Sequence, residues 1–162
     1  MNTSIILFLF PLFFLIHELE EILMMRSWIE KNSIAMYGRF PRFERIIQVM
    51  QKVTRRKVAM IAFEEFLVVV VCTIVSAYTG NLIAWYCCLA AFSVYLLIHI
   101  VQFMVWRGYI PAIVTTLLCL PYCIGVICEV SLPFTSGEWV IYTLLGLILG
   151  GLNLFVMHKF VS

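Results

Sequence analysis

A histidine and three glutamates lie within five consecutive residues near the start of the chain, at His17-Glu18-Leu19-Glu20-Glu21. The stretch ends a long apolar run, which predicts a helix. His17, Glu20 and Glu21 fall on one face of that helix, so that an imidazole lies beside two carboxylates. Imidazole and carboxylate groups together suit Zn, Fe or Mn, and His17 with Glu21 can chelate one ion. This segment therefore predicts a divalent metal site or acid–base chemistry.

Other ionisable residues interrupt the later apolar stretches at a similar depth. At about 1.5 Å of helix per residue, His17 lies roughly 13 Å along the helix axis from the nearest basic residue that follows it or precedes it, Glu64 roughly 10 Å and His99 roughly 12 Å. If each basic residue marks the polar end of an apolar helix, these distances are depths within the helix bundle. We expect Glu64, Glu65 and His99 to complete the metal shell that His17 and Glu21 begin. Three more polar residues near this layer are expected to support the ligands: Gln102, Thr115 and Asn153.

The cost of burying charge supports a shared site. Each ionised side chain near a bilayer centre costs about 2.5 to 3.5 kcal/mol, and the apolar stretches contain no Lys or Arg to neutralise the glutamates. A bound cation, shared protons or water must do so. Glu20, on the same helix face as His17, is expected to be the catalytic acid or base.

The composition indicates which elements position these groups. Of 162 residues, 64% are apolar and 12% are charged, whereas soluble domains are near one half and one quarter. This excludes a soluble enzyme, a nucleic-acid-binding module and a disordered protein. Five stretches are long enough to cross a bilayer, and together they predict an all-α bundle of five transmembrane helices, forming one integral membrane domain over residues 1–162. The stretches cover residues 5–25, 58–79, 82–106, 109–132 and 139–157.

Basic residues set the expected orientation. Nine of the eleven Lys and Arg residues lie between the first two stretches, at residues 26–57, and such loops face the cytoplasm. Arg107 and Lys159 share that side if the N-terminus is outside and the C-terminus inside. Ile46, Ile47 and Val49 alternate with basic residues, which predicts a basic amphipathic helix in the cytoplasmic interface. Both a simple topology anchor and a segment that binds lipid or a partner fit this pattern.

Small residues predict close packing in the last stretch. Gly146 and Gly150 form a GxxxG pattern, which lets two helix backbones approach closely. Packing within the chain and a homodimer both fit this pattern. The six cysteines form no CxxC motif and are expected to be small packing residues.

The His-x-x-Glu-Glu pattern at residues 17–21 resembles the signature of the HXXEE family, bacterial integral membrane proteins of unknown function. The resemblance covers most of the chain. The family pattern continues with Asn-x-x-x-His and Pro-Gly-x-x-Thr; here His99 and Thr115 are retained, whereas Tyr95 replaces Asn and Ala112 replaces Gly. The resemblance implies a multi-pass protein of the bacterial plasma membrane and supplies no reaction.

Four functions remain open from the residues alone. The first is a metal-dependent membrane enzyme, a hydrolase or an oxidase, that acts on a membrane lipid or another lipid-soluble substrate. The second is an intramembrane hydrolase that uses the same Glu and His residues without metal. The third is a carrier for protons or metal ions, which the scarcity of polar residues in the outer half disfavours. The fourth is a structural or regulatory membrane subunit.

Overall fold

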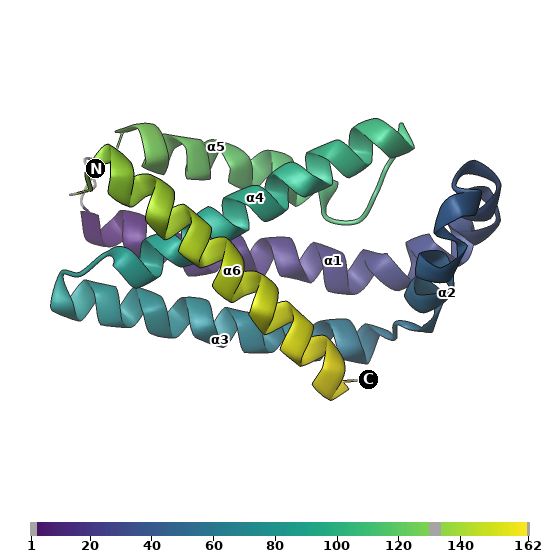
Figure 1. The fold of residues 1–162 in the computed structure, drawn as a ribbon, viewed down its shortest axis with the longest axis horizontal. Coiled ribbons are helices and arrows are strands. Elements are labelled where there is room, and N and C mark those ends of the chain that lie inside the picture. Colours follow the sequence, from purple (N-terminus) through teal and green to yellow (C-terminus); the bar gives the residue numbers. More distant parts are fainter. Residues whose placement is uncertain (1–2, 130–133, 162) are drawn as a thin grey trace.

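The computed structural model describes residues 3–129 and 134–161, which form α-helices, one short 3₁₀ helix and no strand (Figure 1). This confirms the expected all-α fold over these residues. In Figure 1, α1, α3 and α4 run along the long axis, α5 covers one flank, α6 crosses α4 diagonally and α2 lies at one end. The elements are α1 (Thr3–Arg39), η1 (Pro41–Phe43), α2 (Glu44–Lys52), α3 (Arg55–Thr79), α4 (Ile83–Trp106), α5 (Ile113–Glu129) and α6 (Ser136–Val161).

Among the described residues, three helices rather than the expected five are long and apolar enough to cross a membrane, namely α3, α4 and α6. The apolar part of α1 is interrupted by the glutamates of residues 18–21. The 17 residues of α5 span about 26 Å, less than the roughly 30 Å of a hydrocarbon core. This helix starts at Ile113, because Ala112 just before it has a left-handed backbone with φ 64°. The expected end of the fourth stretch, residue 132, lies outside the described residues.

The first helix is longer than the expected span over residues 5–25. It runs for 37 residues, through Pro11 and on to Arg39, because residues 26–37 contain neither Gly nor Pro. It ends just before Phe40, which precedes Pro41, and a residue before proline avoids the helical conformation. Much of the expected loop between the first two spans is therefore helical.

The basic segment that follows contains the predicted amphipathic helix. In α2, which packs against α1, Ile47 is buried, whereas Ile46 and Val49 are 56% and 62% exposed. Arg26 of α1 donates a hydrogen bond of 2.6 Å to the carbonyl oxygen of Gln51. This bond helps to hold α2 against the polar half of α1.

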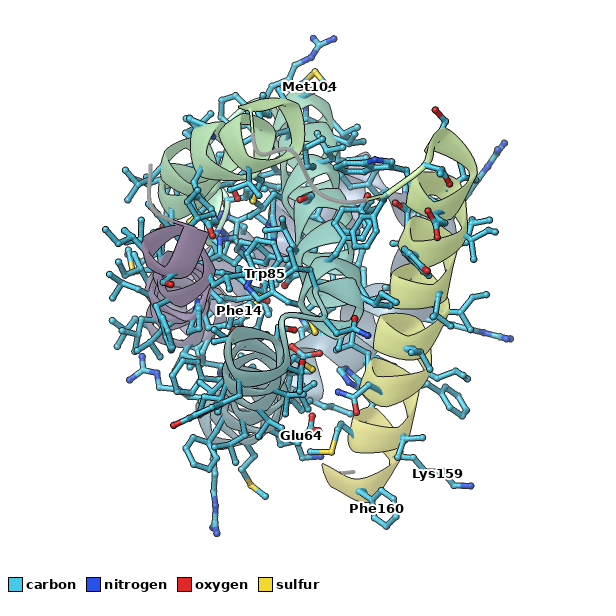
Figure 2. The ribbon with its side chains drawn as sticks, turned by 90° about the vertical axis from the view of Figure 1, so that its left-hand side faces the viewer. Phe14, Glu64, Trp85, Met104, Lys159 and Phe160 are labelled. Carbon is cyan, nitrogen blue, oxygen red and sulfur yellow. The ribbon has the colours of Figure 1, made fainter. Side chains whose placement is uncertain are left out.

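Aromatic side chains fill the core between α1, α4 and α5. The ring of Phe10 lies 5.8 Å from those of Trp85 and Phe92. The indole nitrogen of Trp85 donates to the carbonyl oxygen of Leu7 at 3.3 Å, and Tyr122 of α5 donates to that of Ile6 at 2.7 Å. Figure 2 shows Trp85 at the centre of the bundle. These contacts fix α4 and α5 against the apolar half of α1.

Glycines bring α6 close to α4. A Cβ atom at Gly146 would clash with the backbone carbonyl of Cys87, and one at Gly150 would lie 3.5 Å from the Cβ of Ala91. The GxxxG pattern therefore packs two helices within the chain, which is one of the two alternatives that the sequence leaves open. Figure 2 shows α6 at one side of the bundle, next to α4.

Candidate metal centre

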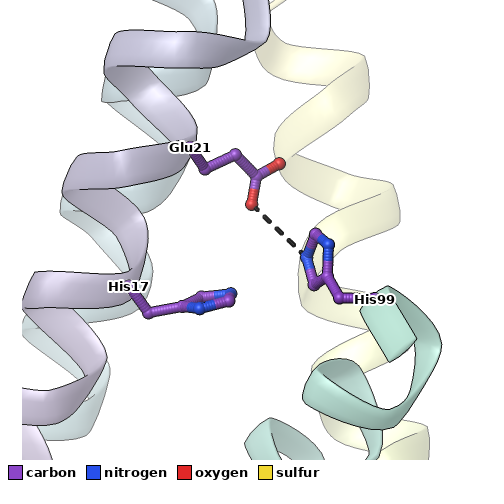
Figure 3. Close-up of side chains that lie close together, drawn as sticks. All are labelled: His17, Glu21 and His99. Atoms are coloured by element: carbon purple, nitrogen blue, oxygen red, sulfur yellow. Dashed lines mark ion pairs between the residues drawn. The ribbon is translucent and has the colours of Figure 1, made fainter. Parts of the chain in front are cut away.

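Three buried side chains from two helices converge at one point. His17 and Glu21 of α1 and His99 of α4 each place a ligand atom within 4.8 Å of the other two. The exposed fractions are 0%, 8% and 4%. Figure 3 shows His17 and Glu21 on successive turns of α1, pointing toward His99, whose Nε2 lies 3.8 Å from Oε2 of Glu21. These three residues form the His–Glu–His cluster.

The helical repeat and aromatic packing position the cluster. His17 and Glu21 are four residues apart and therefore share a face of α1. The His17 ring meets the ring of Phe92 edge-on at 5.4 Å and that of His99 at 5.1 Å. Tyr95, one turn before His99 on α4, places its ring 4.7 Å from the His99 ring. Aromatic rings therefore surround both imidazoles.

Most of the imidazole nitrogens in the cluster lack a hydrogen-bond partner. Nε2 of His17 and both ring nitrogens of His99 are buried and bond to none of the described residues. A buried polar group without a partner costs about 1–3 kcal/mol. The cluster is thus incomplete as a hydrogen-bond network, and it presents nitrogen lone pairs to a common space.

The remaining nitrogen of His17 has a partner that sets its tautomer. Nδ1 lies 3.2 Å from the hydroxyl oxygen of Thr115, which itself lies 2.7 Å from Oε2 of Glu20. If the hydroxyl donates to the carboxylate, its oxygen accepts the proton of Nδ1. Nε2 of His17 then carries the free lone pair, and this nitrogen points into the cluster. Such outer hydrogen bonds are typical of histidines that bind metal.

Glu20 lies at the beginning of α5 rather than in the cluster. Oε2 accepts the backbone amide of Thr115 at 2.8 Å, and Oε1 accepts the hydroxyl of Tyr109 at 3.0 Å. A carboxylate at a helix N-terminus is stabilised by the amides and by the helix dipole. Burial and the bond to Glu20 raise the pKa of Tyr109, in the loop before α5, to about 12, so this hydroxyl stays a donor. Both carboxylate oxygens of Glu20, which the sequence suggested as the acid or base, therefore accept hydrogen bonds.

The loop before α5 contains Ala112, one of the two residues that depart from the HXXEE pattern. Ala112 is fully buried and has φ 64°, a conformation that glycine adopts without steric cost. Its carbonyl oxygen accepts the amide of Thr116 at 2.9 Å, which starts the helix. The HXXEE pattern that the sequence resembles has glycine at this position, and Ala112 takes the left-handed conformation that glycine adopts more readily.

Tyr95 is a member of the site that residue types did not predict. Its hydroxyl donates to Oε2 of Glu21 at 2.5 Å. The family motif has Asn at this position, another residue that can donate a hydrogen bond. The four-residue spacing from Tyr95 to His99, which places both on one face of α4, was the available signal.

Glu18 is a second such residue. Its side chain is 6% exposed and interacts electrostatically with Glu21 and with Glu65 of α3. Glu65 in turn interacts with Glu21. These two carboxyl groups border the cluster, although neither belongs to the group of ligand atoms that lie within 4.8 Å of one another.

Three of the expected site residues, Glu64, Gln102 and Asn153, are not part of the His–Glu–His cluster. Glu64 accepts a hydrogen bond of 2.8 Å from Asn153 of α6 and lies between α3 and α6 (Figure 2). Gln102 is exposed. The ligand atoms that lie within 4.8 Å of one another include none from Glu64 or Glu65, and the expectation that these two residues complete the metal shell stays a prediction. Glu64 and Glu65 are adjacent on α3, so their side chains point about 100° apart and face different neighbouring helices.

The donor set of the cluster fits a divalent transition metal. In a tetrahedral site with bonds of about 2.0 Å, ligand atoms lie about 3.3 Å apart. The 3.8 Å between His99 and Glu21 is close to this value, and small rotations of the side chains would close the remainder. Two imidazoles and one carboxylate also match the three-ligand sets of catalytic zinc and of non-haem iron.

Comparisons with known proteins identify the family. The comparisons with curated proteins and with solved structures give no match. The model of one protein family matches residues 8–127, a range that contains the whole His–Glu–His cluster together with Glu20 and Thr115. The chain therefore belongs to the family described as proteins of unknown function with an HXXEE motif.

Proposed function

We propose that the chain is a membrane enzyme that binds one divalent metal ion, Zn, Fe or Mn, through His17, Glu21 and His99. The reaction is hydrolysis or oxidation of a lipid-soluble substrate. The proposal rests on three buried imidazole nitrogens that lack a hydrogen-bond partner among the described residues and lie beside a carboxylate. Metal coordination satisfies one nitrogen of each ring, and imidazoles buried without a partner would otherwise destabilise the fold.

Three protein ligands leave a coordination position open. Catalytic zinc sites commonly use three protein ligands, and iron oxygenases use two histidines and one carboxylate. When bound, the ion supplies a Lewis acid that polarises a substrate or activates water or oxygen. Because the ligand side chains are at most 8% exposed, bulk water has little access to them.

Residues around the cluster have separate roles in this proposal. Thr115 and Glu20 are positioning residues, since they orient His17 so that Nε2 faces the metal. Tyr95 orients Glu21. Because both oxygens of Glu20 already accept hydrogen bonds, Glu18 and Glu65 are the carboxyl groups placed for proton transfer beside the cluster.

The outward face of the helices supports insertion in a membrane. On α6, Leu144, Ile148 and Leu152 are 54%, 59% and 56% exposed. A continuous apolar surface of this kind is rare on soluble monomers. We propose that α1 and α5 lie in the bilayer together with α3, α4 and α6, since Phe8 of α1 and Leu117 of α5 are also more than half exposed.

The distribution of charge supports one orientation. The eleven Lys and Arg residues lie in the second half of α1, in η1, in α2, in the first turn of α3, after α4 and near the end of α6. These segments gather toward one end of the bundle (Figure 1). By the positive-inside rule, this end is cytoplasmic, with the N-terminus on the opposite side.

Metal content tests the proposal. The full chain, purified in detergent without chelator, is compared with His17→Ala, Glu21→Gln and His99→Ala by elemental mass spectrometry. We expect stoichiometric Zn, Fe or Mn in the native chain and its loss in all three variants, with Glu64→Gln as the matched control that retains it. A native chain without metal, or variants that keep it, would contradict the proposal and favour a metal-free Glu and His site.

A further inference from the structure

We infer that a groove about one helical turn from the His–Glu–His cluster binds the substrate, and that the substrate is an amphiphile with a negatively charged head group. The inference rests on the proposed function and names the substrate class for that site. The groove has a volume of about 420 Å³ and lies between the second half of α1 and the end of α4 with its following loop. Its walls include Met24, Trp28, Lys31, Trp106 and Tyr109.

The groove follows the same helix faces as the cluster. On α1, Glu21, Met24, Trp28 and Lys31 succeed one another at intervals of three or four residues. At 3.6 residues per turn, they fall within an arc of about 100°. On α4, Trp106 comes seven residues after His99, which is two helical turns further along the same face. The groove therefore begins about one turn beyond Glu21 and runs away from the cluster.

One loop residue connects the groove with the network behind His17. Tyr109 lines the groove and donates its hydroxyl to Glu20, which accepts from Thr115, the partner of His17. The carbonyl oxygen of Tyr109 accepts the indole N–H of Trp28 at 2.7 Å. A ligand that displaces Tyr109 or Trp28 thus acts directly on the residues that orient His17.

The walls suit both parts of an amphiphile. The rings of Trp28 and Trp106 lie 5.2 Å apart, edge to face, and Met24 lies one turn nearer the cluster. Together they offer an apolar wall to the groove. At the far end, Lys31 is exposed and forms no ion pair with the described residues. The groove is lined by this one cation and by no Asp or Glu.

This arrangement favours an anion at the outer end of the groove. Asn32 and Ser27, which also line the groove, add polar groups near Lys31. Lys31 is ten residues from Glu21, which is about 15 Å along a helix. The substrate is therefore expected to carry its reacting group about 15 Å from its negative charge. A head group at the basic end of the bundle would lie in the membrane interface, with the chain directed toward the cluster.

Quenching of tryptophan by a brominated amphiphile tests the inference. Dodecyl phosphate with bromine on its chain is titrated into the chelator-treated full chain in a non-ionic detergent. We expect saturable quenching, since Trp28 and Trp106 line the groove. Lys31→Gln should weaken binding about two- to fivefold, the range for an ion pair of an exposed lysine, whereas Lys31→Arg should retain it. Lys52→Gln, a change of the same type on α2, is the matched control and should bind normally.

Two competing ligands decide which part of the probe is recognised. Brominated dodecylphosphocholine, which is zwitterionic, should bind more weakly than the phosphate by about the same factor as Lys31→Gln. Inorganic phosphate should not displace the probe at similar concentrations, because it lacks the chain. Non-saturable quenching, equal affinity in Lys31→Gln, or equal competition by inorganic phosphate would overturn the inference.

The two proposals fail in distinguishable ways. Binding is measured without metal, and the metal content of Lys31→Gln is measured separately. Normal metal content without saturable binding would overturn the groove as the substrate site and leave the metal centre intact. Saturable, Lys31-dependent binding in a native chain that purifies without metal would support the groove and contradict the proposed enzyme.

Discussion

Two groups of polar side chains lie among the apolar helices of this chain. One is the His–Glu–His cluster between α1 and α4, and the other is the pair of Glu64 and Asn153 between α3 and α6. The pair is closed, because the amide of Asn153 donates to the carboxylate at 2.8 Å. The cluster is open, because three of its four ring nitrogens have no partner among the described residues. Polar groups that satisfy each other stabilise packing, whereas buried polar groups without a partner require a further explanation such as a bound ion or water, and we propose a metal ion.

The largest expected effect is a difference in metal affinity between a variant of the His–Glu–His cluster and a variant of the Glu64–Asn153 pair. Glu21→Gln should weaken metal binding by at least about 100-fold, above the range typical of residues that only support a ligand. Glu64→Gln, the same change in the closed pair, should leave the affinity unaltered. Competition with a metal-sensitive fluorescent chelator measures both variants. Equal losses in the two variants would remove the distinction between the open cluster and the closed pair.

The next effect concerns the residue that orients His17. Thr115→Val removes the hydroxyl between Glu20 and Nδ1 of His17, and the expected loss in metal affinity is about 10- to 100-fold. Thr116→Val is the control, since this neighbouring threonine is fully buried and its hydroxyl has no partner among the described residues. The same competition assay applies. Native affinity in Thr115→Val would show that the hydroxyl does not orient the ligand.

A third change affects α6 and should spare the cluster. Gly146→Ala introduces a methyl group against the carbonyl of Cys87, and overpacking of this kind destabilises a fold by about 1–3 kcal/mol. Gly151→Ala, on the same helix with nothing within 4 Å of the added atom, should not destabilise the fold and gains up to about 1 kcal/mol from the helix propensity of alanine. Unfolding in detergent measures stability, and metal content is measured in parallel. Loss of metal in folded Gly146→Ala would mean that α6 supports the cluster.

The smallest effects compare two single hydrogen bonds. Asn153→Ala and Tyr95→Phe each remove one donor from a carboxylate, and each should lower stability by about 0.5–1.5 kcal/mol. Only Tyr95→Phe should also weaken metal binding, because its partner Glu21 is one of the three proposed ligands. Unfolding and chelator competition on the same two samples check this. A change in metal affinity in Asn153→Ala alone would reverse the assignment of the two groups.

The sequence predicts the helical fold and brings attention to the residues of the His–Glu–His cluster, because both depend on local spacing. Apolar runs indicate helices, and the four-residue spacing of His17 and Glu21 places them together on α1 whatever the tertiary structure. His99 was located by its depth along an apolar stretch. Depth is preserved when helices pack side by side, so this residue too could be found.

Rotation of the helices could not be predicted in the same way. Glu64 and Glu65 are adjacent, and only the packing of α3 decides which of them faces α1 and which faces α6. The capping role of Glu20 depends on the turn at Ala112, which brings the start of α5 against α1. Glu18 and Tyr95 belong to the site because α3 and α4 border that side of α1. These relations arise from tertiary contacts, and the only local signal among them is the four-residue spacing that places Tyr95 on the same face of α4 as His99.

The number of membrane spans shows a related difficulty. Residues 5–25 are mostly apolar, yet the helix continues to Arg39 and carries its glutamates within it. The mean hydropathy of a stretch does not show whether a helix ends at the membrane interface or continues beyond it. A helix satisfies its own backbone hydrogen bonds in both environments, so its backbone can pass through the interface without a break.

X-ray absorption spectroscopy of the purified, metal-loaded chain tests the central claim most directly, since it reports the ligands themselves. We predict a zinc, iron or manganese ion with two imidazole rings and additional oxygen ligands at about 2.0–2.2 Å, and the loss of one imidazole in His99→Ala. A spectrum with no imidazole contribution, or one dominated by sulfur at about 2.3 Å from the cysteines, would contradict the account.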